Sequence, residues 1–266
     1  MGRAKEIIIK PIPSNIANEF VKKHHYSGKV VNNSVLHFGA FLDGVLHGVM
    51  SYGSPLDKRK VLPLVVDGSG KVCLWNEMLE LNRMAFDDIL PKNSESRCIS
   101  ITIKLIKKNA PHIKWILSFA DGTQCGDGII YKASGFALTG INKNNTLIKF
   151  PSGDIIAGMT IEANPHLPIV RKQSEYFGIE HKYRTRNEWI KLGAKKLDGF
   201  QLRYIYLIDK SCRITVPVLP FSKIDEIGAG MYKGEKRVSG EKVSRSEPTE
   251  NRRGSTDPDA PYKNPC

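Results

Sequence analysis

The chain has 266 residues, a length that favours one large domain or one domain with attachments. Hydrophobic residues make up 41% of it, which is enough to bury a sizeable core. The net charge of +13 favours a polyanionic partner, namely DNA, RNA or an acidic membrane surface, and we expect a nucleic acid first.

The cysteine pattern argues against a disulfide framework and against a four-cysteine zinc site. The five cysteines are odd in number, and no two are separated by only two residues. The first residues lack the apolar core of a signal peptide, and no apolar run approaches the ~18 residues of a membrane span. These features predict a soluble protein of the reducing cytoplasm that has no membrane contact.

The first part of the sequence predicts a strand, a helix and a hairpin. Residues 6–12 are β-branched and are stopped by prolines, as in a strand. A helix follows over 14–26, with Ser14 as a possible N-cap and apolar residues at helical spacing. Residues 35–53 hold two apolar runs around an Asp-Gly pair at 43–44, which predicts a hairpin.

The next segments lead into a predicted helix. Residues 56–72 are basic and interrupted by Gly and Pro, which indicates a loop or an irregular strand, and residues 75–86 predict a strand over their centre. Ser94 or Ser96 then caps a helix that ends near Pro111. The isoleucines in this segment alternate in a way that also fits a strand. The choice between helix and strand therefore depends on the neighbouring segments.

Those neighbours favour an α/β unit. Residues 112–121 predict a buried strand, and a short helix and a strand at 137–141 follow it. The order is then strand, serine-rich loop, helix, strand, short helix, strand. We therefore predict an α/β fold of the α+β type, with a mixed central sheet flanked by helices.

The rest of the chain predicts an insertion, a late strand and a tail. Residues 142–200 are less regular, with a strand at 149–156 and a basic amphipathic helix at 183–197. Residues 200–209 alternate in aromatic and polar character, as a strand does. The polar composition from residue 233 onward predicts a disordered tail over 233–266, so the folded domain spans 1–232.

A serine-rich loop at 91–98 is a candidate anion site. It joins a predicted strand to the start of a helix, where backbone amides and the helix dipole favour phosphate. Lys92 and Arg97 would add positive charge. The alternative is an ordinary helix cap with solvated charges, since the loop is neither a Walker A loop nor a glycine-rich dinucleotide turn.

Tyr131 and Asp121 are candidates for proton transfer. Tyr131 lies on the short helix after the buried strand, and a phenol with a pKa near 10 can give a proton to a leaving thiolate. A packed core tyrosine is the alternative. Asp121 ends the buried strand, at the edge where α/β sites tend to lie, although such an Asp is often only a turn former.

Two further polar groups stand out. His24 and His25 are adjacent and diverge by about 100 degrees on a helix, so one of them is a candidate base or metal ligand unless both belong to an exposed helix end. Arg83 is a charge inside an apolar strand and needs a partner. It either pairs with a carboxylate such as Glu80 or orients a substrate.

The α/β unit resembles the GNAT acyltransferase superfamily. The matching pieces are the loop "NSESR" and the helix "IIYKASGF", although serines stand where the superfamily's loop usually has glycines. The resemblance implies a GNAT-like mixed sheet and binding of acetyl-CoA or a related acyl-CoA. In that comparison the cofactor loop comprises Ser94, Glu95, Ser96 and Arg97.

A longer resemblance covers roughly residues 8–232. The segments "HHYSGKVVNNS", "WNEMLELNRMAF", "APHIKWILSFADGTQCGDGIIYKASGF" and "GFQLRYIYLID" are similar to those of the Mom DNA-modification proteins of Mu-like phages. The resemblance implies conversion of adenine in DNA to N6-carbamoylmethyl adenine in a bacterial host cell, which shields phage DNA from host restriction. To reach N6, the enzyme would have to flip the adenine out of double-stranded DNA or bind it in a single-stranded state.

The same resemblance ranks the candidate residues. It implies catalytic roles for Tyr131, Asp121, Arg83 and His25, and it suggests His25 as a ligand of an iron-type metal site. The basic helix at 183–197 would suit a DNA backbone, through Arg184, Arg186 and Lys191.

Other functions have weaker support in the sequence. An acyltransferase for another amine would not need the charge of +13, and a DNA-binding anti-restriction protein would act without chemistry. An adenine N6-methyltransferase usually carries a D/N-P-P-Y/F/W motif, and this chain has no Pro-Pro pair.

Overall fold

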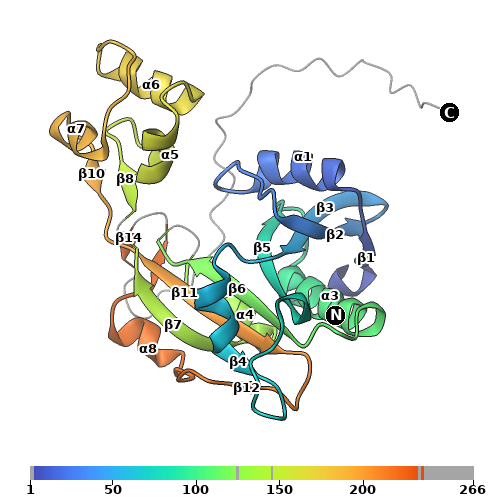
Figure 1. Cartoon of the computed structure of the whole chain (residues 1–266). Helices are drawn as coiled ribbons and strands as arrows, with labels where there is room; N and C mark the ends of the chain where they lie inside the picture. The colour runs from blue at the N-terminus through green and yellow to red at the C-terminus, as the bar shows by residue number, and fades with distance from the viewer. Residues whose placement is uncertain (1–2, 124–125, 145, 233–234, 237–266) are drawn as a thin grey trace.

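A seven-stranded sheet runs through the computed structural model, which describes residues 3–123, 126–144, 146–232 and 235–236 (Figure 1). The strand order is β1-β2-β3-β5-β6-β11-β7, and only β5 and β6 are parallel. The mixed sheet flanked by helices confirms the predicted fold class. The strands are β1 Ile8–Pro11, β2 Ser34–Leu42, β3 Val45–Gly53, β5 Met78–Phe86, β6 Trp115–Asp121, β7 Ala137–Lys143 and β11 Phe200–Leu207.

The N-terminal elements agree with the predicted strand, helix and hairpin. After a 3-10 turn at Arg3–Glu6 and strand β1, helix α1 spans Ser14–His24 and packs on β3 and β5. The β2–β3 hairpin turns at Asp43 and Gly44, whose φ angles of 52° and 80° suit the tight turn that matches strand twist. The predicted cap at Ser14 is wrong, because Ser14 is the first helical residue and no side chain caps α1.

Helices α1 and α3 cover opposite faces of the sheet. Val49 on β3 packs in the α1 cluster, whereas its neighbour Met50 packs in the cluster of α3. Helix α3 spans Ser94–Asn109, so the ambiguous isoleucine segment is helical, as predicted. Its residues Ile99, Ile103 and Ile106 lie on one buried face, which a strand could not provide.

The predicted cap of α3 is wrong. The N-cap residue is Asn93, in the left-handed conformation at φ 69°, and no side chain caps the helix. Ser94 instead donates its hydroxyl hydrogen bond to the carbonyl of Pro91, and Ser96 donates to the carbonyl of Asn93 at 3.3 Å. The serines therefore stabilise the loop, and the first amides of α3 are left without a side-chain acceptor.

The parallel strands β5 and β6 pair over only four residues each. The pairing runs from Met78 opposite Trp115 to Leu81 opposite Ser118, and it stops there. Beyond that point each strand bonds only to its outer neighbour, so the sheet forks. The hydroxyl of Ser118 donates to the carbonyl of Leu81 at 3.0 Å and satisfies a backbone group where the fork begins.

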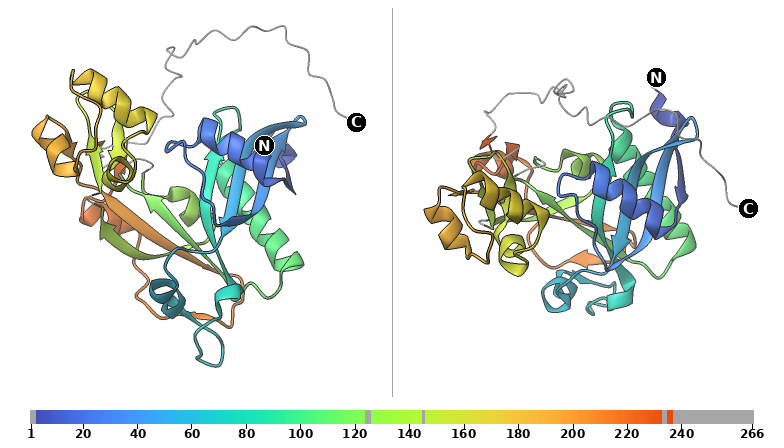
Figure 2. Two further views of the ribbon diagram at one scale, coloured as in Figure 1. Left: turned by 45° about the horizontal axis from the view of Figure 1, so that its top comes forward. Right: turned by 90° about the horizontal axis from the view of Figure 1, so that it is seen from above.

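The insertion between β7 and β11 forms a small unit with a core of its own. Its strands are β8 Leu147–Lys149, β9 Ile155–Ala157 and β10 Lys195–Lys196, and its helices are α5 Gly158–Ala163, α6 Pro168–Tyr176 and α7 Arg186–Lys191. Phe150 and Trp189 are buried at its centre. Figures 1 and 2 show this unit across the β5–β6 fork from α1.

Two predictions for the insertion need correction. The strand expected at 149–156 is two antiparallel strands joined by a turn, where Gly153 adopts φ 87°. The helix expected at 183–197 is only α7, because Gly193 adopts φ 115° after it and Lys195 and Lys196 form β10. A glycine with positive φ stops a helix more effectively than the amphipathic pattern extends it.

Shorter elements complete the chain. Residues 56–72 contain helical turns rather than only loop or strand: α2 Lys58–Val61 and η2 Leu62–Leu64 precede β4 Val65–Val66, and η3 Trp75–Glu77 follows. Helix α4 spans Ile129–Ala133, β12 spans Arg213–Ile214, and α8 spans Ser222–Glu226.

The predicted boundary at residue 232 falls within a short hairpin of β13 Met231–Tyr232 and β14 Glu235–Lys236. The remainder of the predicted disordered tail lies outside the described residues. Within the described ranges, no helix has the length and apolar character needed to cross a membrane.

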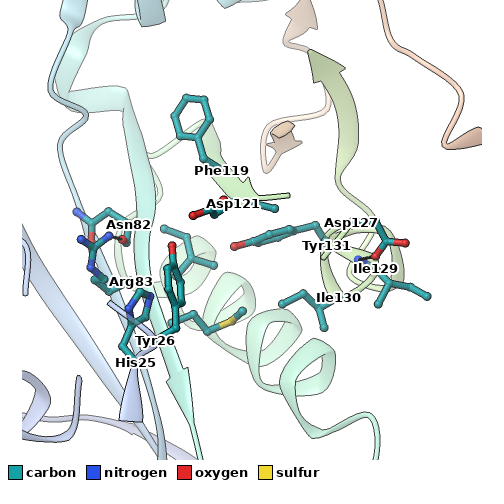
Figure 3. A pocket seen from close by; sticks show the side chains of 14 residues that line it. His25, Tyr26, Asn82, Arg83, Phe119, Asp121, Asp127, Ile129, Ile130 and Tyr131 are labelled. Atoms are coloured by element: carbon teal, nitrogen blue, oxygen red, sulfur yellow. Dashed lines mark hydrogen bonds between the residues drawn. The ribbon is translucent and has the colours of Figure 1, made fainter. Parts of the chain in front are cut away.

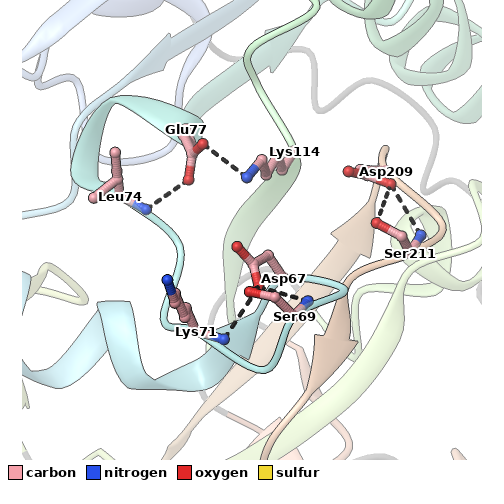
Figure 4. A network of polar contacts seen from close by, with 8 residues as sticks. All are labelled: Asp67, Ser69, Lys71, Leu74, Glu77, Lys114, Asp209 and Ser211. Carbon is pink, nitrogen blue, oxygen red and sulfur yellow. Dashed lines mark hydrogen bonds and ion pairs between the residues drawn. The ribbon is translucent and has the colours of Figure 1, made fainter.

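A polar network lies where β5 and β6 begin, at the opposite end of these strands from the open fork (Figure 4). Lys114, just before β6, pairs with Glu77 at 2.8 Å, and Glu77 also accepts from the backbone N–H of Leu74 at 2.7 Å. The hydrogen bond to Glu77 raises the pKa of Lys114, and the charge of Asp67 adds to this rise. The charge of Lys114 in turn helps to lower the pKa of Asp209. Lys114 thus balances three carboxylates that belong to three different loops.

We predict that Lys114→Met lowers the free energy of unfolding by about 1 kcal/mol, because it leaves partly buried carboxylates without their cation. Urea denaturation measures the change. Lys223→Met is the matched control, since Lys223 forms an exposed pair with Glu226 three residues away. Equal losses in the two variants would contradict a special role for the Lys114 network.

Candidate active site

The fork between β5 and β6 opens into a cavity of about 220 Å³ (Figure 3). Its walls come from the end of α1, from the separated parts of β5 and β6, and from helix α4. The four residues that the sequence analysis put forward as catalytic all line it: His25, Arg83, Asp121 and Tyr131. These residues are distant in the sequence, and the fork brings them together.

Tyr131 is both packed and directed into this cavity. Only 6% of the residue is exposed, its ring stacks on Tyr204 with centroids 4.9 Å apart, and Phe136 meets it edge-on at 5.4 Å. Its hydroxyl points toward the middle of the cavity in Figure 3. The two sequence alternatives, core tyrosine and proton donor, therefore describe opposite ends of one side chain.

A glycine makes this packing of Tyr131 possible. Gly128 precedes α4 with φ 68°, and a Cβ atom there would lie 2.8 Å from the ring of Tyr204. A larger residue would strain the backbone and displace the ring on which Tyr131 stacks.

Asp121 ends β6 at the open end of the fork. One of its carboxylate oxygens accepts from the backbone N–H of Thr123 at 3.0 Å, so it does form the turn that its position suggested. The carboxylate also lines the cavity and lies near the Tyr131 hydroxyl in Figure 3. A carboxylate has capacity for several hydrogen bonds, so the turn leaves room for a bond to substrate.

His25 lies just past the last turn of α1, where the chain leaves the helix. Its Nδ1 accepts from the backbone N–H of Ser27 at 3.2 Å, which puts the proton of the neutral ring on Nε2. Burial lowers the pKa of His25 to about 4, with the charge of Arg83 as a smaller cause. His24 instead stacks on Phe20, outside the cavity, because α1 still turns at that residue.

Arg83 lines the cavity without the predicted ion pair, and its role in orienting a substrate stays a prediction. No ion pair joins it to Glu80; its guanidinium donates to the carbonyls of Lys29 at 2.9 Å and of Asn82 at 2.7 Å and lines the cavity. Burial raises the pKa of Glu80 to about 7, and the charge of Arg83 opposes this rise. Arg83 is thus held in place by backbone acceptors while its charge faces the cavity.

Asn82 is a cavity residue that the sequence analysis did not single out. Its Oδ1 accepts from the hydroxyl of Ser34 at 2.8 Å, which orients the amide, and its Nδ2 is buried without a partner within the described residues. A fixed N–H donor at the edge of a cavity suits an oxygen of a bound substrate. An asparagine in a strand carries no sequence signal that would reveal this position.

The predicted cofactor loop borders a separate open groove of about 560 Å³ at the start of α3. Lys92, Ser96 and Arg97 line it together with Lys5. Arg97 donates from Nη2 to the carbonyl of Lys5 at 3.3 Å, and its Nε is buried without a partner within the described residues. Three cations beside a helix start without a side-chain cap fit a diphosphate group.

The other two loop residues have different surroundings. Ser94 is buried and bonded to the loop backbone, and Glu95 is not among the residues that line the groove. The groove also touches Ala133 at the end of α4, whereas the first residues of α4 line the cavity at the fork. Helix α4 therefore separates the two hollows, and a long ligand could contact both.

An iron site at His25 does not fit the residues present. Within the described ranges, no group of three or more His, Cys, Asp or Glu side chains is arranged to hold a metal ion. Among the described residues that line the cavity, the acidic ones are Asp121 and Asp127, and Figure 3 shows Asp127 beside Ile129, on the opposite side from His25.

The three predicted DNA contacts lie in the insertion. Arg184 is buried, with its guanidinium 5.4 Å from the ring centre of Trp189. Arg186 lies 3.6 Å from a carboxylate oxygen of Glu162, and Lys191 is exposed. Arg184 and Arg186 are thus already engaged within the insertion, and Lys191 is the one of the three whose side chain lies open to solvent.

The low pKa of His25 can be tested directly by an NMR titration. We predict that His25 titrates near pH 4 in the folded protein, against 6.5 for the ordinary imidazole. Because the unfolded chain then binds the proton first, this group lowers the free energy of unfolding as the pH falls from 6.5 to about 4.

The same titration in Arg83→Met should give a higher pKa for His25, since a repelling charge is removed. The value should stay below the ordinary one because burial, the larger cause, remains. A folded His25 that titrates like the urea-unfolded chain would show that the imidazole is not buried as described.

The sequence matches the Mom protein family over residues 6–223. It is 38% identical over 145 residues to the methylcarbamoylase mom of Escherichia phage Mu, a region that covers 53% of this chain and 56% of the phage protein. The chain therefore aligns with little more than half the length of that relative.

Solved structures with a similar arrangement include two acetyltransferases. The ribosomal-protein-S18-alanine N-acetyltransferase from Escherichia coli matches with a TM-score of 0.41 and 10% identity, over 76% of this chain and 94% of that chain. A GNAT family acetyltransferase from Elizabethkingia anophelis with acetyl-CoA bound matches with a TM-score of 0.39 and 16% identity, over 57% and 93%. The family match alone runs from residue 6 to residue 223, most of the sequence, and the chain therefore belongs to the Mom protein family.

Proposed function

We propose that this protein modifies adenine in DNA at N6, adding a carbamoylmethyl group and so protecting the DNA from restriction. The observation that carries the proposal is the convergence of Tyr131, Asp121, Arg83 and His25 on one cavity at the fork. Membership of the Mom family supports it, as does the name methylcarbamoylase of the phage Mu relative.

The cavity residues suit a transfer to an amino group. In the reaction N6 forms a bond to carbon and loses one proton, while the donor's leaving group departs with the electron pair of the broken bond and takes up a proton. We assign Asp121 to the proton that N6 releases and Tyr131 to the proton that the leaving group gains. Arg83 and Asn82 orient a substrate oxygen with fixed N–H donors.

We assign His25 a supporting role as a neutral imidazole. With a pKa of about 4 it carries no charge at pH 7, so it does not repel the nearby Arg83. Its Nε2–H remains as a donor toward the cavity, since Nδ1 accepts from Ser27. Protonation of His25 would place two positive charges at one end of the cavity.

The groove at α3 fits the diphosphate of an acyl-CoA, whose thiolate would be the leaving group when it is bound, but attack on its thioester carbonyl would form a bond from N6 to a carbonyl carbon, whereas the carbamoylmethyl group requires a bond from N6 to a methylene carbon. Lys5, Lys92 and Arg97 would hold the phosphates of the acyl-CoA together with the first amides of α3, and Ser96 lines the same groove. Plain acetyl transfer would leave N-acetyladenine, so a donor of the carbamoylmethyl group must also carry the nitrogen.

The DNA partner fits the charge of the chain. A net charge of +13 favours binding to a phosphate backbone, and the exposed Lys191 is our proposed phosphate contact in the insertion. Arg184 and Arg186 would hold α7 in position for that contact. The reaction would take place in the cytoplasm of a bacterial host, where the DNA is, and it requires the adenine to leave the base stack.

Mass spectrometry of nucleosides from fully digested DNA tests the function. DNA from cells that express this protein should contain an adenine species heavier by one carbamoylmethyl group, absent from an empty-vector control. An adenine heavier by an acetyl group would show plain acyl transfer instead. Unmodified DNA, with soluble protein confirmed in the same cells, would refute the proposal.

We predict that Tyr131→Phe keeps the fold and reduces modification by at least about a hundredfold, because it removes only the proposed proton donor. The ring contacts with Tyr204 and Phe136 do not need the hydroxyl. The matched control is Tyr206→Phe, which removes a hydroxyl from a tyrosine that also packs on Phe136 but does not line the cavity. A fully active Tyr131→Phe protein would assign Tyr131 to the core alone.

A further inference from the structure

A second and larger cavity, of about 610 Å³, adjoins the one at the fork. It lies between the loop after α1 and the insertion, and Arg83 of β5 and Asp121 of β6 also line it. Tyr26, Arg83 and Asp121 border both cavities, so the two hollows meet at these side chains. A ligand in each would have its reactive end at this junction.

The two walls of the second cavity differ in character. On the side of α1, Tyr26 is 52% exposed and presents an aromatic face beside the glycine at 28. The insertion contributes apolar side chains from β9 and from the start of α6, among them Ile155, Ala157 and Ile169. An aromatic face opposite an aliphatic wall suits a flat ring that stacks on the first and packs against the second.

Specific contacts hold these walls in place. Lys29 Nζ donates to the hydroxyl of Thr160 on α5 at 2.8 Å, which joins the loop after α1 to the insertion. Asp154 accepts from Lys172 at 3.1 Å and from Gln173 at 2.7 Å, which ties the turn before β9 to α6. The insertion thus has a built contact with the core at the cavity, although most of its packing is internal.

We propose that this second cavity, hereafter the acceptor cavity, receives the adenine base flipped out of DNA. The inference rests on the proposed function and adds the place and orientation of the substrate. The base stacks on Tyr26, the insertion covers its other face, and its exocyclic N6 donates to Asp121 at the junction. The cavity at the fork then holds the reacting end of the donor on the other side of Asp121.

This placement gives the insertion a function. The acceptor cavity does not exist without β9, α5 and α6, whose residues form one of its walls. A base that stacks on an aromatic side chain gains affinity independently of any chemistry. Binding of the base can therefore be measured separately from modification.

The test uses fluorescence anisotropy with two labelled single-stranded oligonucleotides. One carries a single adenine, and the other has an abasic site at that position. The protein should bind the adenine oligonucleotide about tenfold more tightly, since the rest of the strand is shared. Tyr26→Ala should remove this preference by deleting the stacking face, and Ala157→Phe should remove it by filling the acceptor cavity from the insertion.

The matched control is Tyr183→Ala, because Tyr183 is 53% exposed, as Tyr26 is, and borders neither cavity. It should keep the preference for adenine. Thermal melting of each variant checks that the fold is retained, and Ala157 lies outside the cavity at the fork.

The outcomes separate the inference from the function on which it rests. A preference for adenine that survives both Tyr26→Ala and Ala157→Phe would overturn the acceptor cavity. So would the absence of any preference in a wild-type protein that modifies cellular DNA, and in that case the proposed function would stand. Unmodified DNA in cells with the wild-type protein would overturn the proposed function and the inference together.

Discussion

The site depends on a parallel ladder that stops after four residue pairs. Where β5 and β6 cease to bond at Leu81 and Ser118, the sheet must open, and the strand ends beyond that point can present side chains to a ligand. Such an opening exposes backbone groups that would otherwise be paired. The bond from Ser118 to the carbonyl of Leu81 satisfies one of them, so the fork begins at a stabilised position.

Burial at the fork then sets the protonation of the groups around it. The imidazole of His25 is uncharged at neutral pH because burial, and to a smaller extent the charge of Arg83, lowers its pKa to about 4, while burial raises the pKa of Glu80 to about 7. Arg83 keeps its charge because a guanidinium does not lose its proton in a protein, and two backbone carbonyls accept hydrogen bonds from it. The result is a cavity lined by the guanidinium of Arg83, the carboxylates of Asp121 and Asp127, and Tyr131.

The insertion supplies a wall for the second cavity that the central sheet does not provide. Its core around Trp189 and Phe150 lets it fold as a separate layer, and its contact with the loop after α1 encloses a second cavity against the fork. A sheet with a single fork can hold one ligand at its edge. A transfer between two ligands needs a second wall, which the insertion provides in our proposal.

Several residues show which features of the structure a local sequence pattern can predict and which it cannot. The hairpin at Asp43 and Gly44 was predictable because its turn needs two residues with positive φ, and the sequence places Asp-Gly there. The predicted cap at Ser14 is wrong because Ser14 is already helical. The predicted cap at Ser94 is wrong because its hydroxyl donates instead to a loop carbonyl, that of Pro91. The predicted length of the helix at 183–197 is wrong because an amphipathic pattern carries no information about the backbone conformation at Gly193, which ends the helix.

The class of fold and the order of the elements in the central sheet follow from the sequence, because periodicity and turn chemistry are local properties of the chain. The segments that carry the family resemblance are likewise local. The sequence also supplied His25, Arg83, Asp121 and Tyr131 as candidates. The packing of the chain is needed to show that these four residues line one cavity, that Asn82 lines it with them, and that the insertion encloses a second cavity beside it. These facts depend on where β5 and β6 stop pairing and on contacts between segments more than a hundred residues apart, such as Lys29 with Thr160, which no local pattern encodes.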